Sequence, residues 1–267
     1  MSLPRILLGA AMVAALSISL TAQQAPTGYH HIQCVKVNPG QQAATQEWIA
    51  GDLHKLGQSL VDSGAYAQTL VLRTQIPSGT DAQCDYVFVT FYNGLPTAPR
   101  TRDELNMALR KADIPMTADA YSAKLTEMGK LVWDNITQFQ ALVGGAKKGD
   151  YLEFNSMSSP DPDACVALEK KDWQPLADQM VKDGNTDGWA INRQVFPRGA
   201  RDEPAVSTVD IFPSWDAFTH HYDSIRSAWK KVHADADFSS TMAQHGKLCS
   251  IEHTVLYKVT DVVTPAK

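Results

Sequence analysis

The chain contains an internal repeat, and this repeat limits its possible folds more than any other feature. When the sequence is shifted by 120 residues, LGQSLVDSG at 56–64 aligns without gaps with LADQMVKDG at 176–184. The same offset matches Arg73 with Arg193 and Pro77 with Pro197. An offset that holds through helix, turn and strand patterns predicts a tandem duplication. We therefore expect two repeats, at 23–145 and 146–267, preceded by a separate segment at 1–22.

The first repeat has a clear order of predicted elements. Strand patterns cover 29–37, 69–76, 86–92 and 131–142, and an apolar stripe with helical spacing covers 41–63. Thr101 and Glu104 form a capping box that opens a second helical region, which Pro115 divides in two. This order is that of a ferredoxin-like βαββαβ unit. The predicted fold class is α+β, with two tandem ferredoxin-like repeats that form a pseudo-dimeric α/β barrel.

The chain resembles the dimeric α/β-barrel superfamily. The resemblance is carried by this topology and by Val-Lys-Val-Asn-Pro-Gly at 35–40, which leads into a first helix with a tryptophan, Trp48 or Trp173. The superfamily includes antibiotic-biosynthesis-type monooxygenases, EthD-like and NIPSNAP-like proteins, and haem-handling relatives. The resemblance implies cofactor-independent oxygenation or isomerisation of a small molecule. A second alternative is haem binding, with His31 or His253 as the axial ligand.

The first 22 residues have the pattern of a secretory signal peptide. Arg5 precedes an apolar run that extends to Leu20, and small residues follow around Ala22. We expect cleavage and export to the periplasm or the medium, with an uncleaved anchor as the alternative. No later segment is long and apolar enough to span a bilayer, so no membrane contact is expected after cleavage.

Charge and motif content exclude several kinds of partner. Lys and Arg number 24 against 29 Asp and Glu, and no basic block is present, which argues against nucleic-acid binding. No HxxxH or carboxylate–histidine spacing occurs, so we expect neither a metal site nor a bound cofactor. Because the pseudo-dimer lies within one chain, we expect a monomer.

The four cysteines are expected to form one disulfide in each repeat. In a ferredoxin-like sheet Cys34 and Cys84 fall toward one end of neighbouring strands, and Cys165 and Cys249 likewise share one end of the second repeat. An exported protein meets oxidising conditions, which favours both bridges. The alternative for Cys34 and Cys84 is a pair of buried free thiols.

Alternation along the strands predicts which side chains face the space between the two sheets. Since successive strand residues point to opposite faces, we assign the apolar Ile32, Cys34, Leu152 and Phe154 to the helices. The opposite face would line a ligand cavity. Its predicted members are His31, Gln33, Val35, Tyr151, Glu153, Asn155, Tyr86, Phe88, Thr90, Tyr92, Val206, Thr208, Asp210 and Phe212. The alternative is a barrel filled by its own side chains, which would suit a non-catalytic binding or interaction module.

Within that face we assign hypothetical roles. His31 is a candidate general base, with Glu153 as its orienting partner and Tyr151 as a third catalytic group. Candidate ligand-binding residues are Gln33, Asn155, Tyr92, Arg73 and Arg193. The two arginines could clamp an anionic substrate, and the alternative is that each holds a structural ion pair. The predicted function is an exported small-molecule-binding protein, and whether it is an enzyme stays open.

Overall fold

The computed structural model describes residues 28–96, 100–197 and 205–266. The predicted signal peptide, 1–22, lies outside these residues. The described part contains eight strands and their connecting helices, in an order that repeats β-α-β-β-α-β. In the first half these are β1 (Tyr29–Val37), α1 (Gln42–Trp48), π-helix η1 (Ile49–Leu53), α2 (His54–Asp62), β2 (Gln68–Ile76), a 3-10 turn η2 (Gly79–Asp81), β3 (Tyr86–Tyr92), α3 (Arg102–Lys111), α4 (Ala118–Met128) and β4 (Gly129–Gly144). In the second half they are β5 (Tyr151–Ser158), α5 (Pro162–Lys182), β6 (Gly188–Phe196), β7 (Val206–Phe212), α6 (Trp215–Thr219), α7 (His221–Val232), α8 (Phe238–Leu248) and β8 (Ser250–Val263).

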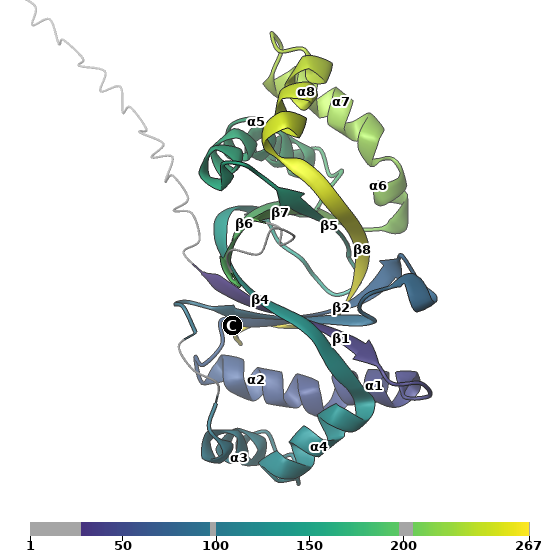
Figure 1. Ribbon diagram of the computed structural model, residues 1–267, viewed down its shortest axis with the longest axis vertical. Helices are drawn as coiled ribbons and strands as arrows, with labels where there is room; N and C mark the ends of the chain where they lie inside the picture. The colour runs from purple at the N-terminus through teal and green to yellow at the C-terminus, as the bar shows by residue number, and fades with distance from the viewer. Residues whose placement is uncertain (1–27, 97–99, 198–204, 267) are drawn as a thin grey trace, which may run out of the picture.

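The eight strands form a closed antiparallel barrel in the order β1-β3-β2-β8-β5-β7-β6-β4. The last strand of each half closes it. β4 pairs with β1 of its own half and with β6 of the other, while β8 pairs with β5 and with β2. Figure 1 shows β4 and β8 passing between the two halves. The predicted α+β barrel is confirmed, whereas duplication of the sequence stays a prediction.

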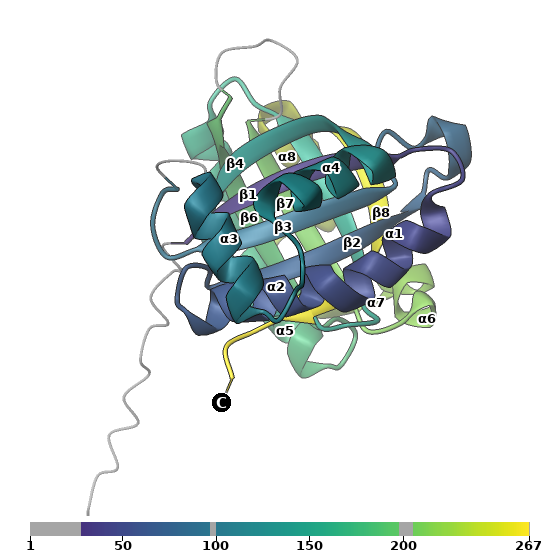
Figure 2. The ribbon, with the colours of Figure 1, turned by 90° about the horizontal axis from the view of Figure 1, so that it is seen from below.

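Helices cover the barrel from two opposite sides. In Figure 1 the helices α1–α4 lie below the strands and α5–α8 lie above them. Turned by 90°, the molecule shows α1–α4 lying across β1, β2 and β3 (Figure 2). Trp48, Leu56 and Leu109 of the first helical layer pack on Val71 and Tyr86 of the sheet beneath.

Local signals placed the helices close to where the structure has them. The region expected to be one helix over 41–63 is a continuous helical segment that changes from α to π geometry at Ile49–Leu53 and back again. Thr101 and Glu104 make both hydrogen bonds of the capping box. These signals depend on neighbours in the sequence, which explains why they were readable without the fold.

Both predicted disulfides are present. Cys34 bonds to Cys84 and Cys165 to Cys249, with Cα–Cα distances of 5.3 and 5.5 Å. Among the described residues, no helix combines the length and the apolar character needed to cross a membrane.

Candidate functional site

The inside of the barrel is packed with apolar side chains from both halves. The buried members of this interior cluster are Ile32, Cys34, Leu70, Leu72, Cys84, Val87, Val89, Leu152, Ile211, Tyr257 and Val259. The prediction that Ile32 and Leu152 face the helices was therefore wrong, because both lie in the interior. The residues of opposite parity point outward. The interior is enclosed by sheet on all sides and takes the more apolar face, whereas the outer face is only partly covered by helices and tolerates polar groups.

The aromatic residues predicted to line the interior also lie on the outer face. Tyr86 and Phe88 pack against the helices α1–α4. Val206 belongs to the cluster under α5, and Phe212 contacts Phe218 of α6 with ring centroids 5.5 Å apart. The expected cavity between the two sheets is thus not lined by these residues.

His31 and Glu153 do not form a pair. His31 Nε2 lies 3.0 Å from Asp134 Oδ2 on the outer face of the first sheet, and both side chains are partly exposed. Glu153 alternates with Leu152 and Phe154 of the interior, and its register partner Asp210 interacts electrostatically with Glu169 of α5, so Glu153 lies on the outer face of the second sheet. Because the barrel separates these two faces, His31 cannot share a proton with Glu153.

The histidine that enters the barrel is the neighbouring one. His30 is 4% exposed and packs against Phe91 and Phe139, with ring centroids 4.5 and 3.6 Å away. Burial lowers the pKa of His30 to about 3, so this imidazole is neutral. His253, the other histidine considered for an axial role, is exposed on β8.

Three predicted ligand-binding residues are dispersed. Gln33 is half-buried on the outer face of β1. Tyr92 lies at the end of β3 with its ring 5.3 Å from that of Tyr66. Arg193 forms an ion pair with Asp163 at the start of α5, which is the structural alternative considered for this arginine.

Glu153 and Asn155 belong to a polar cluster on the second sheet. Glu153 is the register partner of Asp210 on β7, and Asn155 Nδ2 donates to Asp210 Oδ2 at 3.5 Å. Thr254 Oγ1 donates to Asn155 Oδ1 at 2.7 Å. Burial raises the pKa of Asp210 well above its usual range, and the neighbouring Glu153 and Glu169 raise it further. Burial also raises the pKa of Glu153. Both carboxyls are thus shifted toward their protonated forms.

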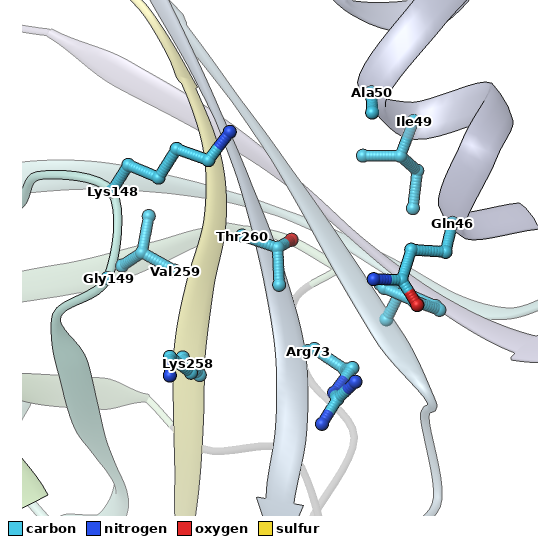
Figure 3. A pocket seen from close by; sticks show the side chains of 10 residues that line it. Gln46, Ile49, Ala50, Arg73, Lys148, Gly149, Lys258, Val259 and Thr260 are labelled. Atoms are coloured by element: carbon cyan, nitrogen blue, oxygen red, sulfur yellow. The ribbon is translucent and has the colours of Figure 1, made fainter.

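A pocket of about 290 Å³ lies on the outer face where the two halves meet. Its strand wall contains Arg73 of β2 and Lys258 of β8, which are register partners, and Lys148 extends over it from the β4–β5 connection. Figure 3 shows these three side chains around Thr260, opposite the helical wall. We call this the cationic pocket. Its full lining is Gln46, Ile49, Ala50, Arg73, Tyr86, Lys148, Gly149, Lys258, Val259 and Thr260.

The cationic pocket has an uncompensated positive charge. Arg73, Lys148 and Lys258 form no ion pair with any carboxylate in the described part of the chain. Lys258 Nζ instead lies 5.2 Å from the ring centroid of Tyr151, its register partner on β5. Burial raises the pKa of Tyr86, so this residue presents a neutral hydroxyl beside the cations. Of the predicted residues, Arg73 thus lines the cationic pocket and Tyr151 lies beside it. Lys258 is the register partner of both.

The helical wall of the cationic pocket is formed where the first helix changes geometry. Ile49 and Ala50 begin the π-helix η1, and Gln46 lies one turn earlier. A π-helical turn inside an α-helix is uncommon and is frequently found at functional sites, because it redirects side chains without ending the helix. Here it accompanies an apolar wall opposite the cations.

Sequence reasoning found Arg73 but missed Lys148 and Lys258. Lys258 becomes a neighbour of Arg73 only because β8 crosses to pair with β2, almost two hundred residues away in the chain. No local pattern marks that pairing. To find Lys258, one would have had to predict that the last strand of each repeat pairs with the other repeat and closes the barrel.

One group of possible metal ligands occurs among the described residues. A carboxylate oxygen of Glu169, a ring nitrogen of His245 and the sulfur of Cys249 lie within 4.8 Å of one another. In this structure Cys249 is bonded to Cys165, so its sulfur is not a thiolate.

Comparison with known proteins supports the fold alone. No family model matches the sequence, and no curated protein matches it. Among solved structures, a Fusobacterium nucleatum protein provisionally assigned as a monooxygenase has a TM-score of 0.55 at 7% identity, over 89% of this chain and 94% of that one. An anthrone oxidase-like protein has a TM-score of 0.53 at 11% identity, over 91% and 95%. A chlorite dismutase from Candidatus Nitrospira defluvii has a TM-score of 0.48 at 9% identity over 88% and 91%, too distant to bear on function.

Proposed function

We propose that this chain is an exported protein that binds a small organic anion in the cationic pocket. The observation that carries the proposal is that Arg73, Lys148 and Lys258 line one pocket without a carboxylate partner among the described residues. Like charges held close together are costly unless an anion compensates them. A bound anion supplies that compensation.

The shape and lining of the cationic pocket indicate the kind of anion. The planar guanidinium of Arg73 suits a carboxylate, which it can bind through two parallel hydrogen bonds. Ile49 and Ala50 offer apolar surface beside it. The volume of about 290 Å³ lies just below the range of about 300 to 1,000 Å³ that is usual for small-molecule sites, so the ligand must be small. We therefore propose a carboxylate with a small apolar or aromatic body.

The two disulfides support the proposal of export, because such bonds persist in oxidising compartments. The predicted signal peptide at 1–22 and the monomeric state remain part of the proposal. A monomer is expected since each half already completes its barrel with the other half of the same chain.

Binding of benzoate, with neutral benzamide as its uncharged counterpart, tests the proposal by calorimetry. We expect Arg73→Gln to weaken benzoate binding about 10-fold or more, equivalent to about 1.4 kcal/mol. Arg193→Gln is the matched control, because Arg193 is the repeat counterpart of Arg73 but pairs with Asp163. Equal effects of the two variants, or equal binding of benzoate and benzamide, would contradict the proposal.

Proton transfer at Glu153 and Asp210 is a second candidate function. It is favoured by the raised pKa of both carboxyls, which brings them toward the range useful for acid–base chemistry. The test is exchange of the α-hydrogens of a 3-oxo acid with D2O, followed by NMR. Catalysed exchange that persists unchanged in Glu153→Gln would rule out this candidate.

A further inference from the structure

Two helices of the second half each present two potential metal ligands, one helical turn apart. Cys165 and Glu169 are four residues apart on α5, and His245 and Cys249 are four apart at the end of α8. This spacing puts Cys165 and Glu169 on the same side of α5, while Cys249 is the C-cap residue directly after α8. All four are at least nine-tenths buried, and the two pairs face each other, since Cys165 is bonded to Cys249 and His245 Nδ1 lies 3.2 Å from Glu169 Oε1.

The donor set matches the preference of Zn²⁺. Thiolate sulfur, imidazole nitrogen and carboxylate oxygen are its usual ligands, and four of them complete a tetrahedral structural site. Bond lengths of about 2.0–2.3 Å place neighbouring ligand atoms about 3.3–3.8 Å apart. The ligand atoms of Glu169, His245 and Cys249 already lie within 4.8 Å, so a contraction of about 1 Å suffices.

A further carboxylate orients the imidazole. His245 Nε2 lies 3.0 Å from Asp172 Oδ2, on the side of the ring opposite Glu169. Metal-binding histidines typically donate their second ring N–H to a carboxylate, which fixes the ring orientation and makes the free nitrogen a better ligand. Asp172 is therefore placed as a positioning residue that leaves Nδ1 available to a metal.

We propose that opening the Cys165–Cys249 disulfide converts this cluster into a Zn²⁺ site formed by Cys165, Glu169, His245 and Cys249. A dithiol reductant supplies two electrons and two protons by thiol–disulfide exchange, so that the dithiol becomes a disulfide and the two cysteines become thiols. Binding of Zn²⁺ then releases the two thiol protons and the proton on His245 Nδ1 to solvent. The disulfide and the metal site exclude each other, so the cluster joins α5 to α8 in either redox state.

The other disulfide provides an internal control. Cys34 and Cys84 belong to the apolar interior cluster, and neither is part of a group of three possible metal ligands among the described residues. Reduction of this pair yields two thiols without nitrogen or oxygen ligands, and a structural zinc site needs four. We therefore expect reduction of Cys165–Cys249 to produce a zinc site and reduction of Cys34–Cys84 to produce two thiols only.

Titration with Co²⁺, a spectroscopic substitute for Zn²⁺, tests the proposal. The full chain carrying Cys34→Ala and Cys84→Ala retains only the α5–α8 pair, and the full chain carrying Cys165→Ala and Cys249→Ala retains only the other. Each is reduced with a phosphine, its free thiols are counted, and its fold is followed by circular dichroism. We expect one equivalent of Co²⁺, with thiolate charge-transfer and tetrahedral ligand-field bands, in the first variant alone.

Two further variants distinguish a four-ligand metal site from Co²⁺ binding by the two thiols alone. In the first background Asp172→Asn is expected to weaken Co²⁺ binding about 10- to 100-fold, as loss of an outer-shell partner does. Glu169→Gln should change the ligand-field bands, because it replaces an anionic carboxylate ligand with a neutral amide. Absence of the bands in the reduced α5–α8 pair, whether folded or unfolded, would overturn the proposal, as would equal binding by the two double variants.

Discussion

His245 offers a direct test of how much a buried charge network stabilises the second half. Its imidazole lies between Glu169 and Asp172 of α5, at 3.2 and 3.0 Å, and the three side chains are exposed by only 7%, 6% and 9%. Leucine has a similar size but donates no hydrogen bond, so His245→Leu leaves Glu169 without its cation and leaves Asp172 with only the exposed Lys171 Nζ, 3.6 Å away. Hydrogen bonds to charged groups contribute about 1.5–3 kcal/mol each, and breaking a buried ion pair costs about 3–5 kcal/mol. We expect His245→Leu to lower the free energy of unfolding by about 3–5 kcal/mol.

Urea unfolding followed by tryptophan fluorescence measures this loss, and an exposed ion pair between α7 and the C-terminal end of α5 supplies the control. Lys231 Nζ lies 2.8 Å from Asp183 Oδ2, with the two side chains 51% and 24% exposed. Because solvent screens such pairs, Lys231→Met should cost about 1 kcal/mol or less. Equal costs for the two variants, at equal dependence on urea, would refute the argument from burial.

The pH dependence provides an independent check of the same reasoning. Burial lowers the pKa of His245, but hydrogen bonds to Glu169 and Asp172 outweigh it and raise the pKa above 6.5. A folded-state pKa above the unfolded value means that the folded protein binds the proton more tightly. The stabilisation is therefore complete below the unfolded pKa and is lost as the pH rises through the folded pKa. The cost of His245→Leu should be larger at about pH 6 than at about pH 9, and a cost that does not change would contradict a charged His245.

Two further predictions concern Asp210 and a tightly packed glycine. Because the pKa of Asp210 is raised, the folded protein retains a proton that the unfolded chain releases. Stability therefore falls as the pH rises between the unfolded and folded pKa values of this carboxyl. Asp210→Asn should raise the melting temperature at about pH 8 and leave it nearly unchanged at about pH 4. A Cβ at Gly188 would lie 2.5 Å from the carbonyl oxygen of Val143, so Gly188→Ala should cost about 1–3 kcal/mol in urea unfolding. The control Gly246→Ala meets no atom within 4 Å on α8 and should not destabilise the protein.

Much of the fold was readable because it depends on short-range signals. The bounds of β1 and β3 were predicted to the residue, and the capping box at Thr101 placed the start of α3. The cysteine pairs followed from the topology, since each pair lies at one end of its half. These features need only the order of elements and the chirality of their connections.

The direction of the side chains could not be read from the same signals. Alternation divided β1 and β5 into two faces correctly, but both faces of these strands are partly covered, one by the opposite sheet and the other by helices. Polarity therefore did not reveal which was the interior. His31 illustrates the error, because its polarity reflects partial exposure beside Asp134 rather than a hydrated interior. The cationic pocket depends on the pairing of β2 with β8, which no periodicity within either strand reveals.

Closure of the barrel also limits how copies of this protein can associate. An open sheet ends in strands with unpaired backbone N–H and C=O groups, onto which another chain can add a strand. In the closed ring every strand has a partner on both sides. Strand addition is therefore limited to stretches that pair on one side alone, such as the first residues of β4 (129–135) and β8 (250–255). Other contacts between copies can form through the helical layers, the loops at the ends of the barrel or the exposed parts of the outer sheet face, such as Leu131 and Ile251.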